Sequence, residues 1–254
     1  MKIYDCFMYF NGLELLELRL ETLYDTVDYF VINEAGQTHT GAKRDFEFDI
    51  NRFEKYKDKI RYIKLETLPY TDGHQNEYYQ RNRLIDGCYD AQPDDYIMIS
   101  DDDEIINPET LKEGIRNNHD LFRLSMKLFY YYVNNLRNQL WGETIVGKRK
   151  HFGNPQDMRM KYNGVPIINN GGWHYSYLGG LDKIQLKFNS FSEQQTNTPE
   201  INNRENILKC LETGEDVCHR QGDIFKNRFI SLEEVGHPQL KEWLTKYPEY
   251  IKII

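Results

Sequence analysis

The most informative segment of the sequence is Ile97-Met98-Ile99-Ser100-Asp101-Asp102-Asp103-Glu104. It is a short apolar run, typical of a buried parallel strand, that leads directly into four carboxylates, which repel one another unless a cation lies among them. Side chains alternate along an extended chain, so Asp101 and Asp103 point to the same side. Open α/β sheets bind ligands at the carboxyl ends of their strands, and hard oxygen donors suit Mg²⁺ or Mn²⁺. The stretch therefore predicts a metal site, the alternative being a solvated acidic turn.

Strand and helix patterns alternate through the residues before this stretch. Apolar runs predict strands over residues 2–10, 28–34 and 60–66, and helical patterns fall over residues 12–25, 51–57 and 76–89. In the first helix, Leu13, Leu16, Leu20 and Leu23 recur at helical spacing. The resulting β-α-β-α-β-α-β order predicts a doubly wound α/β sheet.

The second half of the chain is less regular. Asn107-Pro108-Glu109 combines an N-cap residue, a proline at the first helical position and an acid in the first turn, which predicts a helix start. We expect strands over residues 121–133 and 143–148, loops over 153–180, and helices over 200–212 and 231–247. Because no repeat or linker interrupts the pattern, we predict a single domain over residues 1–254.

Composition excludes several classes of partner. The 254 residues carry 32 Lys and Arg against 40 Asp and Glu, a net charge of −8, which disfavours binding to nucleic acid. No window approaches 18 consecutive apolar residues, so we expect no membrane span, and the N-terminus lacks a signal-peptide pattern. The four cysteines form no C-x-x-C pair and are expected to be reduced thiols. Together these features predict a soluble, cytoplasmic protein.

Tyrosine is unusually frequent, at 19 residues. Two interpretations remain open. Tyrosine rings can complete a core that is otherwise poor in apolar residues, and they can also stack on sugars and hydrogen-bond to them.

Three further segments carry polar groups that could bind a ligand. Gly171–Gly180 places His174 between glycines, where it could be a metal ligand, a proton shuttle or a hydrogen-bonded structural histidine. Glu77–Arg83 offers Arg81, which could clamp a phosphate or form a salt bridge. Asn33–Lys43 is a polar loop after a strand, which could hold a base or ribose or merely connect two elements.

Taken in order, these segments resemble glycosyltransferase family 17, the family of β-1,4-mannosyl-glycoprotein β-1,4-N-acetylglucosaminyltransferases. The resemblance covers roughly residues 3–215. It rests on Tyr4–Phe7, Val27–Glu34 with Thr38, Gly41 and Lys43, Glu77–Asn82, Pro93–Ile105, Gly172–Ser176 and Lys187–Ser192. A single D-x-D motif is a weak signal, whereas this ordered series is specific.

The resemblance implies a GT-A-type, Rossmann-like nucleotide-sugar-binding fold with a mixed central sheet. Residues 1–106 would form the nucleotide-sugar half, and residues 107–254 the acceptor half with the C-terminal helices. The implied reaction is an inverting transfer, with Mn²⁺ or Mg²⁺, of a sugar from a UDP-sugar to a glycan hydroxyl. UDP-N-acetylglucosamine is the expected donor.

The resemblance also implies roles for individual residues. Asp103 would bind the metal directly, Asp101 would lie near the ribose or a metal-bound water, and His174 would add a metal or phosphate contact. Glu34 would lie near the uridine, and Arg81 near the pyrophosphate or in a salt bridge that supports the acid motif. Thr38 and Lys43, in the same polar loop as Glu34, would complete the donor site.

Two departures from the family pattern affect these roles. Ser100 stands where some relatives have an acid and Asp102 where a small residue is usual, so the set of metal-binding carboxylates is open. Glu193-Gln194-Gln195 stands where many relatives have a histidine and a nearby glutamate. An inverting displacement needs one carboxylate base and no protein nucleophile. Glu193 and Glu143 are the base candidates.

Two other classes of function share some of these features. A phosphotransferase of the haloacid dehalogenase type also ends a buried strand in D-x-D, but it calls for Thr or Val where Ile105 stands, and for an earlier position in the chain. A carbohydrate-binding module that uses Ca²⁺ and aromatic rings would bind sugar without binding a nucleotide. Stabilisation of the protein by UDP distinguishes the transferase from the binding module.

Overall fold

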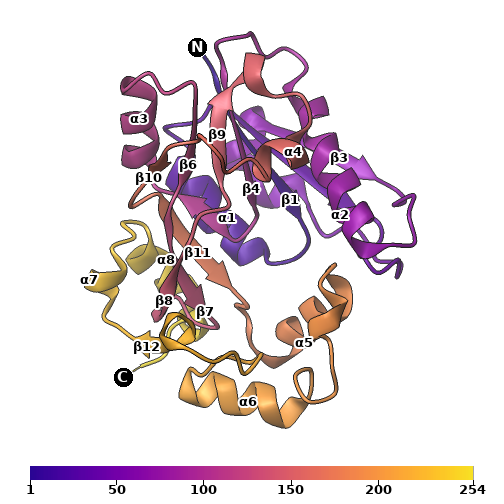
Figure 1. Cartoon of the computed structure of the whole chain (residues 1–254), viewed down its shortest axis with the longest axis vertical. Coiled ribbons are helices and arrows are strands. Elements are labelled where there is room, and N and C mark those ends of the chain that lie inside the picture. Colours follow the sequence, from indigo (N-terminus) through magenta and orange to yellow (C-terminus); the bar gives the residue numbers. More distant parts are fainter. Residues whose placement is uncertain (254) are drawn as a thin grey trace.

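The computed structural model describes residues 1–253 and contains two β-sheets. The larger sheet has seven strands in the order β10-β6-β9-β4-β1-β2-β3 and occupies the upper part of Figure 1. Its strands are β1 (Ile3–Tyr9), β2 (Tyr29–Ala35), β3 (Ile60–Leu65), β4 (Tyr96–Asp101), β6 (Leu121–Leu124), β9 (Ile145–Lys148) and β10 (Ile167–Ile168). Strands β1 to β4 are parallel to one another, whereas β9 runs antiparallel to both β4 and β6. The α/β class with a mixed central sheet is therefore confirmed.

The smaller sheet has five strands in the order β12-β8-β7-β11-β5. These are β5 (Glu104–Ile106), β7 (Met126–Tyr130), β8 (Asn135–Trp141), β11 (Gly172–Ser176) and β12 (Asn227–Phe229). Strand β4 ends at Asp101 in the larger sheet and β5 begins at Glu104 in the smaller one. The four carboxylates thus form the turn by which the chain passes from one sheet to the other, and we call residues 101–104 the acid turn.

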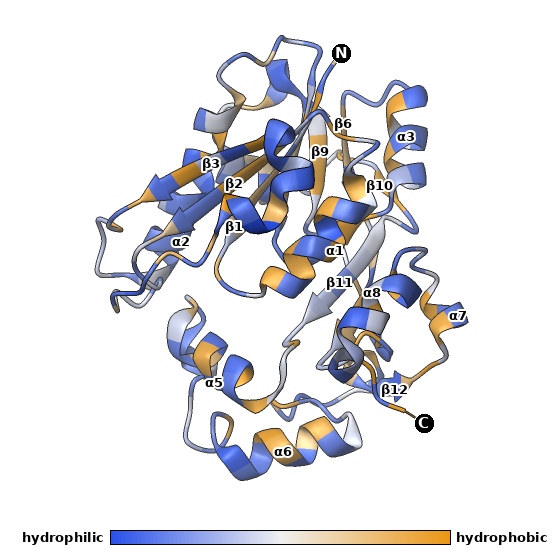
Figure 2. Ribbon diagram, turned by 180° about the vertical axis from the view of Figure 1, so that it is seen from behind, coloured by the Kyte–Doolittle hydropathy of each residue, from blue (hydrophilic) through white to orange (hydrophobic). Residues whose placement is uncertain are grey.

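Helices cover both sheets, and most of these helices are amphipathic. The α-helices are α1 (Leu13–Leu23), α2 (Gly73–Asn82), α3 (Pro108–Arg116), α4 (Pro155–Arg159), α5 (Gly180–Ser190), α6 (Arg204–Thr213), α7 (Leu232–Val235) and α8 (Leu240–Lys246). The longer 3₁₀ segments are η1 (Ile50–Lys59) and η2 (Arg83–Cys88). Figure 2 shows hydrophilic and hydrophobic residues side by side along α3, α5 and α6, as expected of helices that bury one face only.

The core of the larger sheet lies on both of its faces. On one face, Leu16 and Leu20 of α1 pack with Phe7 of β1 and Met98 of β4. On the other face, η2 packs against the alternate residues of the same strands. The side chains of β1 therefore alternate between two buried faces, which places Asp5 on the face covered by α1.

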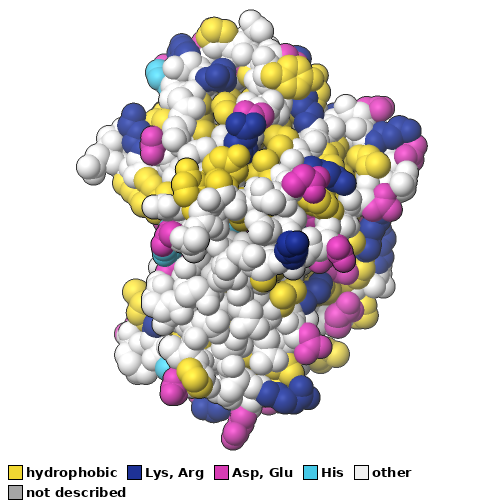
Figure 3. All heavy atoms as spheres, turned by 90° about the vertical axis from the view of Figure 1, so that its right-hand side faces the viewer, with side chains coloured by type: hydrophobic (Ala, Val, Ile, Leu, Met, Phe, Trp, Pro, Cys, Tyr) yellow, Lys and Arg dark blue, Asp and Glu magenta, His cyan; other side chains and the backbone are white. Residues whose placement is uncertain are grey.

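The first of the two roles left open for tyrosine is confirmed, because many tyrosine rings complete the core, whereas contact with a sugar stays a prediction. Five tyrosines are among the largest fully buried side chains: Tyr4, Tyr9, Tyr96, Tyr131 and Tyr175. Others, such as Tyr130 and Tyr177, line the main cavity described below. On the face shown in Figure 3, acidic and basic side chains are interspersed rather than gathered by sign.

The first four strands and the first helix were predicted within two residues of their observed ends, and Asn107 caps α3 through the Glu109 amide at 3.1 Å. Other predictions were wrong. The single strand over 121–133 is two strands in different sheets, β6 and β7, separated at Ser125. The loops over 153–180 contain α4, β10 and β11. The helix over 231–247 is broken into α7 and α8 at Gly236, which has a φ of 71°.

The expected division of the chain at residue 106 does not coincide with the division of the strands between the two sheets. Strand β5 lies before that residue but belongs to the smaller sheet, whereas β6, β9 and β10 lie after it and belong to the larger one. The single domain and its two functional halves stay predictions. No helix within residues 1–253 is long and apolar enough to cross a membrane, and the four cysteines are free thiols.

Candidate functional site

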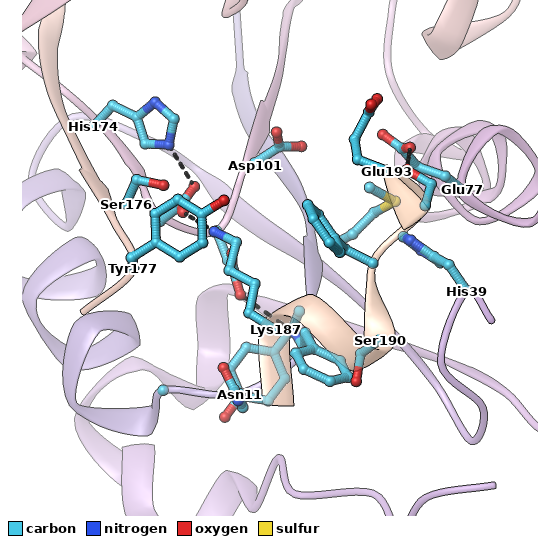
Figure 4. A pocket seen from close by; sticks show the side chains of 18 of the residues that line it. Asn11, His39, Glu77, Asp101, His174, Ser176, Tyr177, Lys187, Ser190 and Glu193 are labelled. Atoms are coloured by element: carbon cyan, nitrogen blue, oxygen red, sulfur yellow. Dashed lines mark hydrogen bonds and ion pairs between the residues drawn. The ribbon is translucent and has the colours of Figure 1, made fainter. Parts of the chain in front are cut away.

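A cavity of about 660 Å³ opens where the two sheets meet. Strands β1, β2 and β4 are parallel, so their carboxyl ends lie along one edge of the sheet and contribute Phe10, Thr38 and Asp101–Asp103 to the lining. The rest of the lining includes the end of β11, α5 and the loop that follows α5 (Figure 4). The acid turn therefore faces a cleft large enough for a small-molecule ligand.

Asp101 is held by two arginines. Its Oδ1 accepts a hydrogen bond from Arg81 Nη2 at 3.1 Å, and its Oδ2 accepts one from Arg159 Nη2 at 2.6 Å. Each arginine also binds a second carboxylate, Arg81 that of Glu77 and Arg159 that of Glu104. Burial alone would raise the pKa of Asp101, but the two guanidinium groups outweigh it and lower the pKa to about 2. Asp101 is therefore an ionised anchor for two fixed cations.

Asp103 is paired with two other basic side chains, His174 and Lys187. Its Oδ1 lies 3.2 Å from His174 Nε2, and its Oδ2 accepts a hydrogen bond from Lys187 Nζ at 3.0 Å. Burial opposes ionisation, yet Lys187 and His174 hold the pKa of Asp103 well below its usual range. In return, Asp103 raises the pKa of both His174 and Lys187 against the effect of burial. These three residues, which all line the cleft, form an ion cluster.

Asp102 is the least compensated member of the acid turn. Its Oδ2 accepts a hydrogen bond from the Phe10 amide at 3.3 Å. Burial, reinforced by the neighbouring charge of Asp103, raises the pKa of Asp102 to about 7. Its carboxylate is therefore the one in the turn that would gain most from an added cation.

Glu104 is fully buried and supports the turn from within. Its carboxylate accepts hydrogen bonds from Trp141 Nε1 and Thr144 Oγ1, each at 2.6 Å, and from Arg159. Because Arg159 also binds Asp101, the two ends of the acid turn are tied to one guanidinium. Glu104 is thus a structural partner rather than an open ligand.

Arg19 of α1 supports the backbone of the same turn from below. Its Nη1 donates to the carbonyl oxygens of Asp101 and Glu104 at 2.7 and 3.0 Å, and its Nη2 donates to Ser100 Oγ at 2.5 Å. The guanidinium is fully buried and is itself held by both carboxylate oxygens of Asp5. The helix and the first strand therefore fix the position at which the chain changes sheets.

The opposite side of the cleft carries a second set of polar groups. Glu77 of α2 accepts hydrogen bonds from Ser192 Oγ at 2.5 Å and from Arg81, and these contacts lower its pKa although burial opposes this. The exposed Glu193 lies in the loop after α5, with its Oε1 4.0 Å from His74 Nδ1. Figure 4 shows Glu77 and Glu193 on one side of the cleft and His174 with Lys187 on the other.

The base candidate Glu143 also lines the cleft, from the segment between β8 and β9. Its Oε2 accepts a hydrogen bond from the Tyr162 hydroxyl and lies 3.5 Å from Arg123 Nη2. Glu143 is therefore partly neutralised, whereas Glu193 stands at the exposed rim and has no arginine or lysine partner among the described residues.

The expected donor-binding residues fall into two groups. Thr38 and Arg81 line the cleft, where Arg81 forms the salt bridge to the acid turn. Glu34 is fully buried and does not line the cleft; its carboxylate accepts hydrogen bonds from the amides of Glu47 and Phe48 and anchors that loop. Lys43 is exposed and also lies outside the lining. The structure therefore brings Asp101, Asp103, His174, Thr38 and Arg81 together, but not Glu34 or Lys43.

Comparison with known proteins identifies the family. The model of glycosyltransferase family 17 matches residues 1–251. The chain belongs to glycosyltransferase family 17. This membership makes the protein a glycosyltransferase, and not a phosphotransferase of the haloacid dehalogenase type or a non-catalytic sugar-binding module. Comparison with curated proteins gives no match.

Several solved structures are similar to this family 17 chain at low identity. Residues 1–349 of TarS from S. aureus are 15% identical with a TM-score of 0.43, the alignment covering 70% of this chain and 60% of that one. Glucosyl-3-phosphoglycerate synthase from Mycobacterium tuberculosis, solved with Mn²⁺, UDP and phosphoglyceric acid, is 12% identical with a TM-score of 0.41 and coverages of 90% and 86%. The cytidylyltransferase IspD from Francisella tularensis is 11% identical, with a TM-score of 0.41 and coverages of 66% and 90%.

The donor chemistry of the acid turn fits the divalent cation that the family resemblance implies. Asp102 and Asp103 line the cleft with carboxylate oxygens, and His174 Nε2 lies 3.2 Å from Asp103 Oδ1. Yet within residues 1–253 no three His, Cys, Asp or Glu side chains converge closely enough to hold a metal ion. The carboxylates of Asp101 and Asp103 already have basic partners: Lys187 pairs with Asp103, and two arginines pair with Asp101.

Sequence reasoning missed three basic residues of this family 17 site: Arg19, Arg159 and Lys187. Only Arg19 left a readable signal, because it falls on the apolar stripe of α1, between Leu16 and Leu23. Lys187 lies in a segment that carries the family resemblance, but the resemblance assigns it no role. Arg159 lies in a segment that was expected to be loop, 58 residues from Asp101 along the chain.

Proposed function

We propose that this family 17 glycosyltransferase moves N-acetylglucosamine from UDP-N-acetylglucosamine to a glycan hydroxyl, with inversion and with the help of Mn²⁺ or Mg²⁺. The observation that carries the proposal is the acid turn at the carboxyl end of the parallel strand β4, facing a cleft of about 660 Å³ and surrounded by four basic side chains. Family membership supports the transfer reaction, and the resemblance described above supports the choice of sugar.

In this proposal the donor lies along the edge formed by β1, β2 and β4. Thr38 at the end of the β2 loop would contact the nucleoside part, and the diphosphate would lie near the acid turn, within reach of Lys187. An anionic donor can approach four acidic residues because Arg81, Arg159, His174 and Lys187 already offset their charge.

Asp103 and Asp102 would hold the divalent cation, with His174 beside them. When bound there, the cation would neutralise charge that develops on the UDP leaving group. Asp101 would keep Arg81 and Arg159 in place, as it does in the structure. Both ends of the turn then stay fixed while its middle carboxylates face the ligand.

The acceptor hydroxyl would attack the anomeric carbon from the face opposite the diphosphate, so one carboxylate must remove its proton. Glu193 is the first candidate, because it lies across the cleft from the ion cluster in Figure 4 and its carboxylate is exposed. Glu143 is the second, since Arg123 and Tyr162 already bind its carboxylate. No protein nucleophile is required.

The experiment that tests this function is a thermal-shift screen of the purified chain with UDP, Mn²⁺ and both together, followed by a panel of UDP-sugars. Stabilisation by UDP that depends on Mn²⁺ is expected, because a ligand that binds the folded state alone raises its melting temperature. Stabilisation by free sugars without any response to UDP would overturn the proposed donor.

A further inference from the structure

Lys187 forms an ion pair with the carboxylate of Asp103, where the proposed metal would bind. It projects from α5 across the cleft, and its Nζ lies 3.0 Å from Asp103 Oδ2. We propose that Lys187 is the resident counter-ion of Asp103, that a divalent cation displaces it, and that the displaced ammonium group then binds the diphosphate of the donor. This inference rests on the proposed function, because it assigns a role at the same site.

Of the lysine and arginine side chains that pair with the acid turn, Lys187 is the one that can leave. Arg81 and Arg159 are nearly buried, and each is fixed by a second carboxylate, that of Glu77 or Glu104. Lys187 has Asp103 as its sole carboxylate partner among the described residues, and 34% of its side chain is exposed. Loss of that one ion pair therefore frees it.

The ammonium group of Lys187 has a second favourable contact that does not depend on Asp103. Nζ of Lys187 already lies 5.0 Å from the centre of the Tyr177 ring, whose π-face attracts a cation. Lysine is a flexible four-carbon chain with a compact charge, so it can change partners without moving α5. Figure 4 shows the ammonium end of Lys187 beside the Tyr177 ring.

Exchange at Asp103 would couple metal binding to donor binding. A divalent cation competes with Lys187 for the same carboxylate oxygen, so its affinity in the absence of donor is reduced. Once displaced, the ammonium group gains a phosphate partner only if the donor is present. The charge-assisted hydrogen bond between them then stabilises the bound donor. Mn²⁺ and UDP should therefore each strengthen the binding of the other.

The test is a titration of the purified chain with Mn²⁺, with and without UDP, in which electron paramagnetic resonance measures free Mn²⁺. The variants are Lys187→Met, Lys187→Gln as a polar alternative, and Lys183→Met as the matched control. Lys183 lies one turn earlier on α5 and also lines the cleft, but its Nζ pairs with Glu14 at 2.9 Å and with no carboxylate of the acid turn. We expect Lys187→Met to bind Mn²⁺ alone about three- to tenfold more tightly than the wild type, because a competing cation is gone.

The same variant should lose most of the increase in Mn²⁺ affinity that UDP produces, whereas Lys183→Met should behave as the wild type does. Asp103→Asn added to Lys187→Met should abolish the gain. The inference is overturned if Lys187→Met and Lys187→Gln bind Mn²⁺ no more tightly than the wild type, if neither binds it, or if Asp103→Asn leaves the gain intact. Sugar transfer by the wild type, followed separately, decides the proposed function whatever the outcome for Lys187.

Discussion

Arg19 and Asp5 form a buried ion pair through two hydrogen bonds, Nε to Oδ2 at 2.8 Å and Nη2 to Oδ1 at 2.6 Å. Both side chains are fully buried, and the guanidinium also lies 4.0 Å from the centre of the Phe7 ring. The remaining guanidinium nitrogen of Arg19, Nη1, donates hydrogen bonds to the carbonyl oxygens of Asp101 and Glu104, at the two ends of the acid turn. One buried cation therefore links the first strand and the first helix to the proposed metal site.

Replacing Arg19 should damage both stability and ligand binding. Removal of one partner from a buried pair leaves the other charge without compensation, so Arg19→Met should lower the free energy of unfolding by about 3–5 kcal/mol. Urea denaturation measures this change. Lys55→Met is the matched control, because Lys55 pairs with Glu21 of the same helix at the surface and should cost about 1 kcal/mol or less. Equal losses for the two variants would contradict the role given to Arg19.

Much of the fold could be predicted from the sequence, because the first hundred residues alternate strand and helix patterns. The apolar run before the carboxylates was correctly predicted as a buried parallel strand, and Asp101–Asp103 line the cleft at its carboxyl end, whereas the metal site itself stays a prediction. The two residues that break the apolar pattern, Asp5 in β1 and Arg19 in α1, are partners in the structure. The apolar patterns of the strand and the helix are broken at these two positions because the buried ion pair supports the acid turn.

The rest of the site could not be predicted, because it is built by contacts that are distant in sequence. Lys187 meets Asp103 across 84 residues, and Arg159 reaches Glu104 from α4, a five-residue helix too short to show periodicity. Glu34 was expected near the nucleotide, yet the fold uses it to anchor the backbone of residues 47 and 48. A polar loop looks the same in sequence whether it binds a ligand or its own chain.

The two base candidates can be separated by conservative variants. Glu193→Gln should lower the turnover rate about 10²–10⁴-fold, which is the usual contribution of a general base. Glu143→Gln should have a smaller effect, because Arg123 and Tyr162 already bind that carboxylate. Stabilisation of both variants by UDP with Mn²⁺ should match that of the wild type, since neither residue is assigned to the donor. Full activity in both variants would refute the assignment of the base to either residue.

His237 should make the protein sensitive to acid. It is buried between Thr22 and Tyr175 at 2.9 Å from each, and it stacks on Trp173. Burial lowers its pKa to about 3, so between pH 6.5 and 3 the unfolded state binds a proton that the folded state does not. Stability should therefore fall as the pH drops below 6.5, by up to about 1.4 kcal/mol per pH unit from this group.

Urea denaturation of the wild type and of His237→Gln between pH 7 and 5 measures this contribution. The variant should have a lower free energy of unfolding at pH 7 but a shallower dependence on pH. His39, whose pKa burial also lowers, should retain part of the slope in both proteins. An unchanged slope in His237→Gln would show that this histidine takes up its proton without unfolding.

The most direct test of the central claim is mass-spectrometric detection of sugar transfer from a panel of UDP-sugars to a glycan library, with Mn²⁺, by the wild type and by Asp103→Asn. The account predicts that the wild type adds one N-acetylhexosamine to an acceptor from UDP-N-acetylglucosamine. Asp103→Asn, folded by circular dichroism, should lose that product together with its stabilisation by UDP. Transfer by Asp103→Asn at the wild-type rate, or no transfer from any UDP-sugar by the folded wild type, would contradict the account.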